Sequence, residues 1–516
     1  MQKFNNYFTD FHTNIHSKQV ADFDLWYKHA RQVIDFWPFA YYPYHEVMLG
    51  SGLKTEGELD VETIKSDWNE LVKKTNEYNR INPEFPLLCG YEWQGSGEDG
   101  DHNVFFKEDG PCILPKRYNE LKNELSEFSS IAIPHHLAYS LEHRGKNWAT
   151  HDSEFSPFAE IYSSHGSSEQ SVCESEMSRH IHMGPRTGST SVFNGLNLGN
   201  KVGIIASGDN HVVPADTNNG LAGVWAQSNS KDDLWEALKS RRVYGMTKNH
   251  MKLWMDIDEN PMGSTITKSD KPRTVHVNVT GNSAIDRVEL IRNGVVANVY
   301  THSGNWETLN SNDSIRFKTH IDFGWGPNPS VYKNLTKRLW EGTLSTNGSI
   351  VSVEKCWSNL GQKVLYQDSH KFDFGMTTYK SSHSGKWMGQ APVVSEGFII
   401  EFEGKLSDEV NLTINGNKTM KKFSDILEET DLIIELEESK KIAKETFGVS
   451  DYYRSDPFYH NAYKTRILKG IPNVGYEVSC EFSIDTVYQD GWYIVKVFQD
   501  DGQIAWSSPV WFINKE

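Results

Sequence analysis

The chain of 516 residues is too long for a single hydrophobic core, so we expect about two or three domains. Hydrophobic residues make up 37% of the chain and aromatic residues 12%, which argues against a disordered protein. The net charge of -17 disfavours nucleic acid as a partner, because that binding relies on neutralising phosphates. A small anionic substrate remains compatible with this charge, since a metal ion can invert the local field.

The sequence offers no signal for export or for a membrane. The first residues, Met-Gln-Lys-Phe-Asn-Asn-Tyr, contain no apolar core of signal-peptide length, and no run of about eighteen apolar residues follows. The five cysteines are widely spaced and form neither a disulfide framework nor a zinc-finger pattern. We therefore expect a cytoplasmic protein that binds no membrane. The sequence does not indicate an oligomeric state.

The first half of the chain alternates helical and strand-like stretches. Amphipathic patterns predict helices over residues 22–36 and 61–78. Short apolar runs predict buried strands over residues 86–91, 130–134, 158–162 and 202–207. Strands that alternate with helices imply a parallel sheet, and we expect this one to close into an α/β barrel over residues 1–250.

From about residue 251 the pattern changes to strands separated by Gly, Asn, Asp and Ser. Alternating stretches such as Thr-Val-His-Val-Asn-Val-Thr predict half-buried antiparallel strands. The predicted strands cover residues 252–257, 274–279, 287–291, 397–403, 478–484 and 491–498. We expect residues 251–516 to form a β-sandwich, with insertions near residues 310–390 and 421–447.

Histidine and carboxylate residues gather in short segments of the first half, several of them directly after a predicted strand. The segments cover residues 10–16, 42–46, 90–93, 101–103, 134–136, 160–169 and 207–211. One histidine in such a place is more often structural than a ligand, but seven segments in half a chain predict a metal site. Imidazole and carboxylate together suit Zn, Mn or Fe, and a bridging carboxylate holds two ions. Such a pair of ions supports hydrolysis.

The order of these segments resembles the polymerase and histidinol phosphatase (PHP) superfamily. The segments Gly-Tyr-Glu-Trp, His-Asn-Val-Phe-Phe and Ser-Gly-Asp-Asn-His are similar to a large PHP branch of unknown function that ends in a C-terminal β-sandwich. The resemblance runs from about residue 8 to 264 and returns over residues 476–513. It implies a distorted (β/α)7 barrel that carries two or three divalent transition metals, Zn, Mn or Fe, and hydrolyses phosphate esters.

Carried over residue by residue, the resemblance implies a first metal site formed by His12, Glu92 and Asp209. Asn14 stands where the opening motif of the family has its second histidine. An asparagine is a poorer zinc ligand than a histidine, so the first site would be weaker or completed by water.

The resemblance also implies a second metal site. Glu92 would bridge to this site, which His102 would complete together with His135 or His136.

A third site would use His16, His45 and His211. Tyr44 stands where the family has an aspartate beside His45, which makes this the weakest of the three sites. His165 follows closely after a predicted strand and would replace or supplement one of these ligands.

Binding of an anion needs positive groups near the metals. Arg144, Lys146 and His151 lie between two ligand segments and are candidates for a substrate clamp. Their other interpretation is a solvated loop. Arg186 is a weaker candidate for the same role.

The function that we predict is a metal-dependent hydrolase, most readily a phosphoesterase that uses a metal-bound hydroxide. Asp209 belongs to the catalytic centre, and either His211 or His165 protonates the leaving oxygen. A sulfate ester, a carboxylic ester or an amide is an alternative substrate. A carbohydrate-binding protein whose barrel has lost catalysis is an alternative of another class, favoured by Asn14 and Tyr44.

Overall fold

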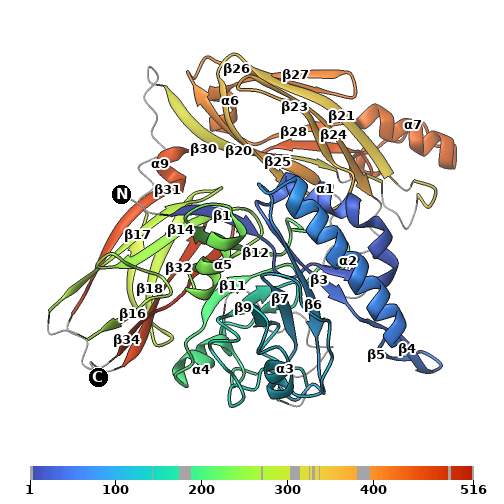
Figure 1. The fold of residues 1–516 in the computed structure, drawn as a ribbon. Coiled ribbons are helices and arrows are strands. Elements are labelled where there is room, and N and C mark those ends of the chain that lie inside the picture. The colour runs from blue at the N-terminus through green and yellow to red at the C-terminus, as the bar shows by residue number, and fades with distance from the viewer. Residues whose placement is uncertain are drawn as a thin grey trace. The chain divides into compact units, whose positions relative to one another are not determined.

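The structure is a computed structural model that describes most of the chain. The described residues are 4–141, 143–173, 187–268, 271–302, 314–324, 326–327, 332–335, 337–379, 395–485 and 490–513. The chain divides into two compact units (Figure 1). Unit 1 comprises Met1–Gly281, Ile285–His302 and Val478–Glu516, and unit 2 comprises Asn282–Ala284 and Ser303–Glu477. These bounds differ from the two consecutive domains that we expected, because the last residues of the chain belong to unit 1.

The first sheet of unit 1 is mixed rather than parallel. Its strand order is β2 (Asn14–His16), β3 (Trp37–Tyr42), β6 (Leu87–Trp93), β7 (His102–Phe106) and β8 (Ser130–Pro134). The first three strands run parallel, but β7 pairs antiparallel with both β6 and β8. A short loop connects β6 to β7 where a parallel barrel would need a helix. The expected (β/α)7 barrel is therefore not evident among the described strands.

Helices and smaller elements connect the strands of this sheet along the chain. They are η1 (Ser17–Asp22), α1 (Phe23–Val33), β4 (Tyr44–Gly50), β5 (Leu53–Glu58), α2 (Val61–Ile81) and α3 (Tyr118–Glu124). Among the described strands, β4 and β5 pair only with each other. The helix α2 begins where the Asp60 carboxylate accepts a hydrogen bond from the Thr63 amide at 2.9 Å. Among the described helices, none has both the length and the apolarity to cross a membrane.

A second, three-stranded sheet lies next in the chain. Its strands are β10 (Gly166–Ser167), β9 (Phe158–Ser163) and β11 (Gly203–Ala206), and β9 and β11 run parallel. The helix α4 (Val192–Asn197) precedes β11. A parallel bridge between Thr13 and Asn210 joins the end of β11 to the start of β2. The loops that follow β1 and β11 are therefore neighbours.

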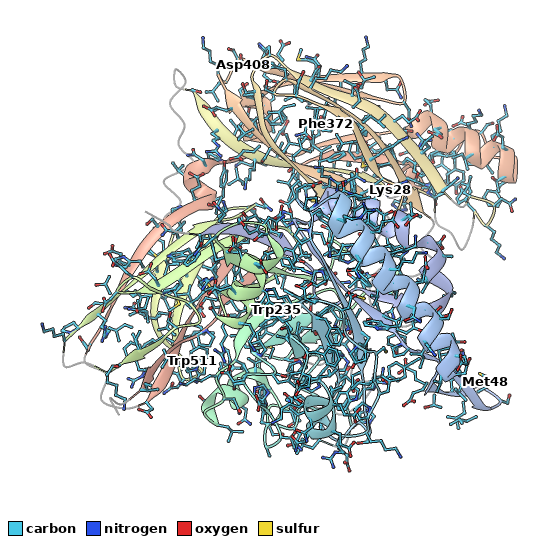
Figure 2. The ribbon with its side chains drawn as sticks, in the orientation of Figure 1. Lys28, Met48, Trp235, Phe372, Asp408 and Trp511 are labelled. Carbon is cyan, nitrogen blue, oxygen red and sulfur yellow. The ribbon has the colours of Figure 1, made fainter. Side chains whose placement is uncertain are left out.

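The nine-stranded sheet of unit 1 combines strands from both ends of the chain. Its strands are β1 (Asn5–Thr9), β12 (Gly220–Ala226), β13 (Val243–Thr247), β33 (Ile504–Ser507), β32 (Gly491–Gln499), β18 (Ile285–Arg292), β19 (Val295–Thr301), β34 (Val510–Ile513) and β16 (Thr265–Thr267). The Trp511 side chain lies in its core, and Trp235 of α5 (Lys231–Lys239) packs against a second apolar cluster (Figure 2). A separate sheet joins β15 (Asn260–Pro261), β14 (Lys252–Ile257), β17 (Arg273–Thr280) and β31 (Glu477–Ile484).

Unit 2 is built mainly from two antiparallel sheets. One contains β22 (Ser349–Cys356), β25 (Glu396–Gly404), β20 (Ile315–Gly324), β29 (Lys464–Ile467), β28 (Asp431–Ile434) and β30 (Ile471–Pro472). The other contains β23 (Lys363–Gln367), β24 (Lys371–Tyr379), β21 (Lys337–Thr346), β26 (Glu409–Ile414) and β27 (Asn417–Lys422). The rings of Phe372 and Phe398, one from each sheet, lie 5.2 Å apart in the shared core. Phe372, which lies in β24, is labelled in Figure 2.

The helices of unit 2 are α6 (Phe423–Glu428), α7 (Leu436–Phe447), α8 (Asp456–His460) and α9 (Asn473–Tyr476). The stretch near residues 310–390, which we expected to be an insertion, supplies β20 to β24 and hence strands of both sheets. The stretch near residues 421–447 contains α6, β28 and α7.

Candidate metal centre

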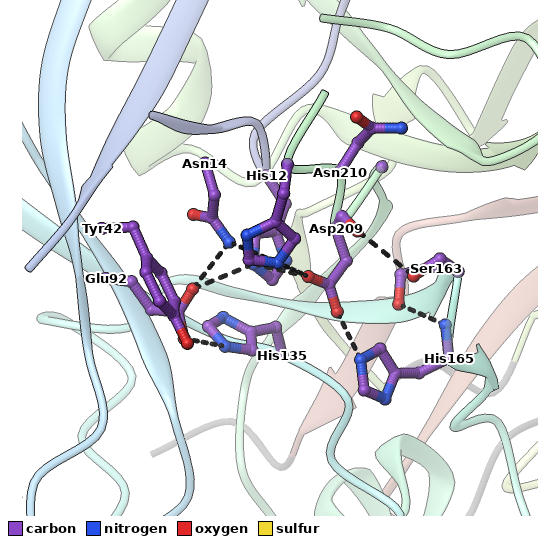
Figure 3. A network of polar contacts seen from close by, with 12 residues as sticks. His12, Asn14, Tyr42, Glu92, His135, Ser163, His165, Asp209 and Asn210 are labelled. Atoms are coloured by element: carbon purple, nitrogen blue, oxygen red, sulfur yellow. Dashed lines mark hydrogen bonds and ion pairs between the residues drawn. The ribbon is translucent and has the colours of Figure 1, made fainter. Parts of the chain in front are cut away.

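Loops and strand ends of the first two sheets bring buried histidines and carboxylates together (Figure 3). His12 lies between β1 and β2, and Glu92 lies in β6. His135 and His136 follow β8, His165 follows β9, and Asp209 follows β11. Parallel strands place their carboxyl ends at one edge, which explains why residues up to about two hundred positions apart converge.

The side chains form three overlapping groups. Within each group, one possible ligand atom from every residue lies within 4.8 Å of the others. The groups are His12 with Glu92 and His135, Asp101 with His135 and His136, and His136 with His165 and Asp209. Every member is buried. His135 and His136 each belong to two groups, so the three groups make one continuous cluster.

Several polar atoms of this cluster lack hydrogen bonds. Within the described part of the chain, neither ring nitrogen of His135 has a hydrogen-bond partner, and the same holds for Nδ1 of His136 and Oδ1 of Asp101. Burying unpaired polar atoms is unfavourable, and native structures rarely do so without a reason. Bound cations would satisfy these atoms, and imidazole with carboxylate is a donor set for Zn, Mn or Fe. The residues present therefore fit a metal centre.

A buried carboxylate orients His12. The Nδ1 atom of His12 donates to Oε2 of Glu160 at 2.9 Å. Its Nε2 atom lies 3.3 Å from Oδ1 of Asp209 and 3.5 Å from Oε2 of Glu92. Glu160 also accepts hydrogen bonds from the Ser207 hydroxyl and from the His136 amide. Metal-binding histidines commonly have such a carboxylate on the nitrogen that faces away from the ion.

Burial and neighbouring charges shift the pKa values of the cluster residues in different directions. Burial, helped by adjacent histidines, lowers the pKa of His135 and of His136 well below the usual value, so both rings are neutral. Burial raises the pKa of Asp101 to about 8. The pKa of Asp209 lies well below its usual value because His12 and His165 outweigh the effect of burial. In His135, His136 and Asp209 these are the forms that bind metals, whereas Asp209 and Glu160 outweigh burial and raise the pKa of His12 well above its usual value.

Asn14 and Tyr44, which depart from the pattern that the sequence resembles, both support Glu92. Asn14 Nδ2 donates to Glu92 Oε2 at 2.8 Å. The Tyr44 hydroxyl accepts a hydrogen bond from the Gln94 amide at 3.0 Å, and the Gln94 side chain donates to Glu92 Oε1 at 3.0 Å. Both departures therefore help to hold the Glu92 carboxylate in place.

The structure places His102, a residue predicted to bind metal, outside the cluster. Its Nδ1 atom donates to the Gly100 carbonyl at 2.8 Å, and its Nε2 atom lies 3.2 Å from Lys146 Nζ. Its neighbour Asp101 lies in the cluster instead. Adjacent residues of an extended segment point to opposite sides, so only one of the two side chains can face the cluster.

The residues predicted to form a third site do not meet as a group. His16 Nε2 lies 2.8 Å from His211 Nδ1, and His211 Nε2 lies 3.7 Å from Asp209 Oδ1. Both histidines therefore flank the cluster. His45 is exposed on β4 and contributes to none of the three groups.

Arg144, one of the predicted substrate-binding residues, contacts the cluster. Its Nη2 atom lies 2.7 Å from Glu56 of β5, and its Nη1 atom lies 3.4 Å from Asp101. Lys146 is fully buried against His102, where burial lowers its pKa to about 7. The ring of His151 lies 5.1 Å from that of Trp148, and Arg186 lies outside the described residues.

Sequence reasoning missed the parts played by Asp101 and Glu160. Asp101 stands directly before His102, so the sequence identifies the segment but not which of the two neighbours joins the cluster. Glu160 is a charged residue in the middle of the otherwise apolar strand β9. A carboxylate in such a buried strand rarely occurs without a partner, and this is the signal that points to Glu160.

Comparisons with known proteins give a limited match. A family model described as "Protein of unknown function (DUF3604)" matches residues 206–271, a range that contains Asp209 and His211. An uncharacterized protein of Chlamydia pneumoniae is 27% identical over 258 residues, which cover 46% of this chain and 41% of that protein. An uncharacterized protein of Chlamydia trachomatis is 27% identical over 286 residues, which cover 49% of this chain and 44% of that protein.

A crystal structure from Bacteroides vulgatus is also similar. It is described as a two-domain protein containing a predicted PHP-like metal-dependent phosphoesterase. The two sequences are 12% identical, the TM-score is 0.31, and the alignment covers 81% of this chain and 96% of that one. A TM-score this low does not establish a shared fold. The chain matches less than half the length of the two chlamydial relatives.

Proposed function

We propose that this protein is a metal-dependent hydrolase that cleaves phosphate esters. The observation that carries the proposal is the continuous buried cluster of imidazoles and carboxylates in unit 1. Its unpaired ring nitrogens on His135 and His136 point to cations as the missing partners.

The ligands that we assign are His12, Glu92, Asp101, His135, His136, His165 and Asp209. Because His135 and His136 are each shared between two groups, the cluster suits more than one ion, as the prediction of two or three divalent metals requires. When bound, such ions supply a nucleophile from water at neutral pH and neutralise charge that develops on the substrate.

Arg144 supports an anionic substrate. Its guanidinium lies beside Asp101 of the cluster and keeps 30% of its side chain exposed. An arginine offers paired N–H groups that match the oxygens of a phosphate. We assign Arg144 to bind the substrate anion. The anion would replace part of the contact between Arg144 and Glu56.

His211 is the better of the two candidates for the proton donor. Its side chain is 38% exposed at the edge of the cluster, so a leaving group can reach it. His165 is buried, with its Nδ1 atom 2.7 Å from the Tyr139 hydroxyl and its Nε2 atom 2.8 Å from Asp209. We therefore assign the proton transfer to His211 and a ligand role to His165.

Metal content tests the proposal first. Protein purified without added metal is measured by elemental analysis beside an Asp209→Ala, Glu92→Ala double variant. We expect transition metal in the parent protein and its loss in the variant. A His276→Ala, Glu481→Ala double variant is the matched control, because this exposed pair, 3.0 Å apart, lies on β17 and β31. The absence of bound metal, with none taken up on titration, would leave a binding protein as the better account.

Substrate class is then tested with aryl esters in the presence of the metal found. We expect hydrolysis of an aryl phosphate that the double variant has lost. Turnover of an aryl sulfate, an aryl acetate or an anilide in place of the phosphate would keep the metal centre and overturn the phosphoesterase assignment.

A further inference from the structure

The carboxylate of Asp10 lies between the two loops that carry His12 and Asp209. Asp10 is fully buried and follows directly after β1. Its Oδ1 atom accepts hydrogen bonds from the His12 amide at 2.9 Å and the Gly208 amide at 2.8 Å. Its Oδ2 atom accepts from the Thr13 hydroxyl at 2.9 Å and the Ala215 amide at 3.1 Å. Two of the four donors come from each loop.

Backbone hydrogen bonds join the same loops on the other side of Asp209. The Asn210 amide donates to the His12 carbonyl at 3.1 Å, and the Asn14 amide donates to the Asn210 carbonyl at 2.8 Å. Asp209 is thus held on both sides. Gly208 before it bonds to Asp10, and Asn210 after it bonds to His12. Its backbone has a φ of 49°, a left-handed conformation that few residues other than glycine adopt without support.

The packing around Gly208 shows how close this contact is. A Cβ atom at position 208 would lie 2.7 Å from Oδ2 of Asp10. Real side chains do not approach so closely, so a residue larger than glycine would push the carboxylate away from its donors. Glycine at position 208, directly before Asp209, therefore leaves the space that the Asp10 carboxylate occupies.

We infer that Asp10 is a positioning residue, which sets the separation between His12 and Asp209 and thereby the metal affinity of the cluster. The His12 Nε2 and Asp209 Oδ1 atoms that would share an ion lie 3.3 Å apart. Asp10 touches neither atom and acts through the two loops, by three backbone amides and the Thr13 hydroxyl. The inference rests on the proposed metal centre.

The direct test is Asp10→Asn in the full-length protein, with Zn²⁺ titrated against a chromogenic chelator. All four partners of Asp10 are donors in the structure. In the asparagine variant an NH₂ group replaces one of the two oxygens. Its N–H bonds would then face the N–H groups of His12 and Gly208, or that of Ala215, and donors would oppose each other. We expect Zn²⁺ affinity to fall by about tenfold to a hundredfold, the usual effect of removing an outer residue of a metal site.

Two further variants separate positioning from general stability. Thr13→Val removes one hydrogen bond to Oδ2 and keeps the shape of the side chain, and we expect a decrease in affinity of about fivefold. Asp35→Asn is the matched control, since this half-buried carboxylate accepts a hydrogen bond from the Phe8 amide of β1 at 2.7 Å. Its Zn²⁺ affinity should equal that of the parent protein, even if its melting temperature falls.

The outcomes distinguish this inference from the proposed function. Unchanged Zn²⁺ affinity in both Asp10→Asn and Thr13→Val would overturn the role of Asp10 and leave the metal centre intact. The role of Asp10 is also overturned if Asp35→Asn loses as much affinity as Asp10→Asn, because the effect would then be one of stability. If the parent protein binds none of Zn²⁺, Mn²⁺ and Fe²⁺, both the inference and the proposed function fail. Should Asp10→Asn not fold, Thr13→Val alone decides.

Discussion

The imidazole of His12 donates to the carboxylate of Glu160 at 2.9 Å, which fixes the ring and directs its other nitrogen toward Glu92 and Asp209. Glu160 itself is anchored by the His136 amide, which donates to its other oxygen at 3.2 Å. One carboxylate therefore orients His12 and contacts the backbone of a second candidate ligand. Both effects act before any ion binds.

Replacing Glu160 with glutamine should weaken metal binding. If the amide oxygen keeps the hydrogen bond from His12, the amide nitrogen faces the His136 N–H group, and two donors oppose each other. We expect metal affinity to fall by about tenfold to a hundredfold, measured by competition with a chelator. Glu481→Gln, which alters an exposed histidine–glutamate pair, is the control and should bind metal like the parent protein. Equal affinity in all three proteins would contradict this role for Glu160.

Replacing Arg144 with methionine should weaken the binding of an anion without removing metal. The variant keeps most of the side-chain volume and loses a charged hydrogen-bond donor. We expect the Kd for inorganic phosphate to rise by about tenfold to a hundredfold, measured by calorimetry on metal-loaded protein. Arg31→Met is the control, because Arg31 pairs with the exposed Glu84 on the surface. An unchanged Kd for phosphate in Arg144→Met would assign the anion to other groups.

The pH dependence of stability should contain a contribution from His29 in α1. Burial lowers the pKa of His29 from 6.5 to about 3, so the folded protein binds this proton less readily than the unfolded chain. Stability from His29 is complete above pH 6.5 and is lost as the pH falls toward 3. Over that interval His29→Gln should reduce the pH slope of the unfolding free energy by up to about 1.4 kcal/mol per pH unit. Urea unfolding of metal-free protein at several pH values measures this slope, and identical slopes would contradict the prediction.

Breaking the buried ion pair between Lys496 and Glu169 should destabilise unit 1 strongly. Both side chains are 2% exposed, and Lys496 Nζ lies 2.7 Å from Glu169 Oε2. Lys496→Met leaves a buried carboxylate without this cation, which costs about 3–5 kcal/mol. Lys54→Met, which removes an exposed pair of the same length with Glu46, should cost less than about 1 kcal/mol. Denaturant unfolding compares the two, and the double variant Lys496→Met, Glu169→Leu should recover much of the loss. Similar costs for both single variants would contradict the prediction.

Local patterns in the sequence are enough to find several elements. The strands predicted at residues 252–257, 274–279, 287–291, 397–403, 478–484 and 491–498 all lie within observed strands. The helices predicted at residues 22–36 and 61–78 overlap α1 and α2. These predictions rest on periodicity over a few turns or pleats, which a single segment contains.

Pairing between distant segments cannot be predicted in the same way. The antiparallel return of β7 depends on the loop between β6 and β7, where Gly95, Gly97 and Gly100 adopt positive φ angles. The pairing of β13 with β33 joins residues more than two hundred positions apart. Neither contact leaves a trace in local periodicity, which is why the sequence predicts a closed barrel and a simple division at residue 250.

At the candidate site, the polar residues that follow predicted strands are informative. Glu92, His135 and Asp209 stand at such positions, and the structure brings all three into the cluster. The choice between neighbours, such as Asp101 and His102, depends on which way each side chain points. A one-residue difference reverses that direction, so the choice needs the structure.

The nine-stranded sheet of unit 1 combines strands from both ends of the chain, which affects how unit 1 can fold during translation. The strand β13 is paired on one side by β12, but its other partner, β33, consists of residues 504–507. A nascent chain that has reached residue 477 has all of unit 2 available for folding, while unit 1 still presents an unpaired edge on β13. Unpaired edges of this kind recruit other strands and promote aggregation, so the edge of β13 is a site of possible aggregation from its own synthesis until residues 504–507 have been made.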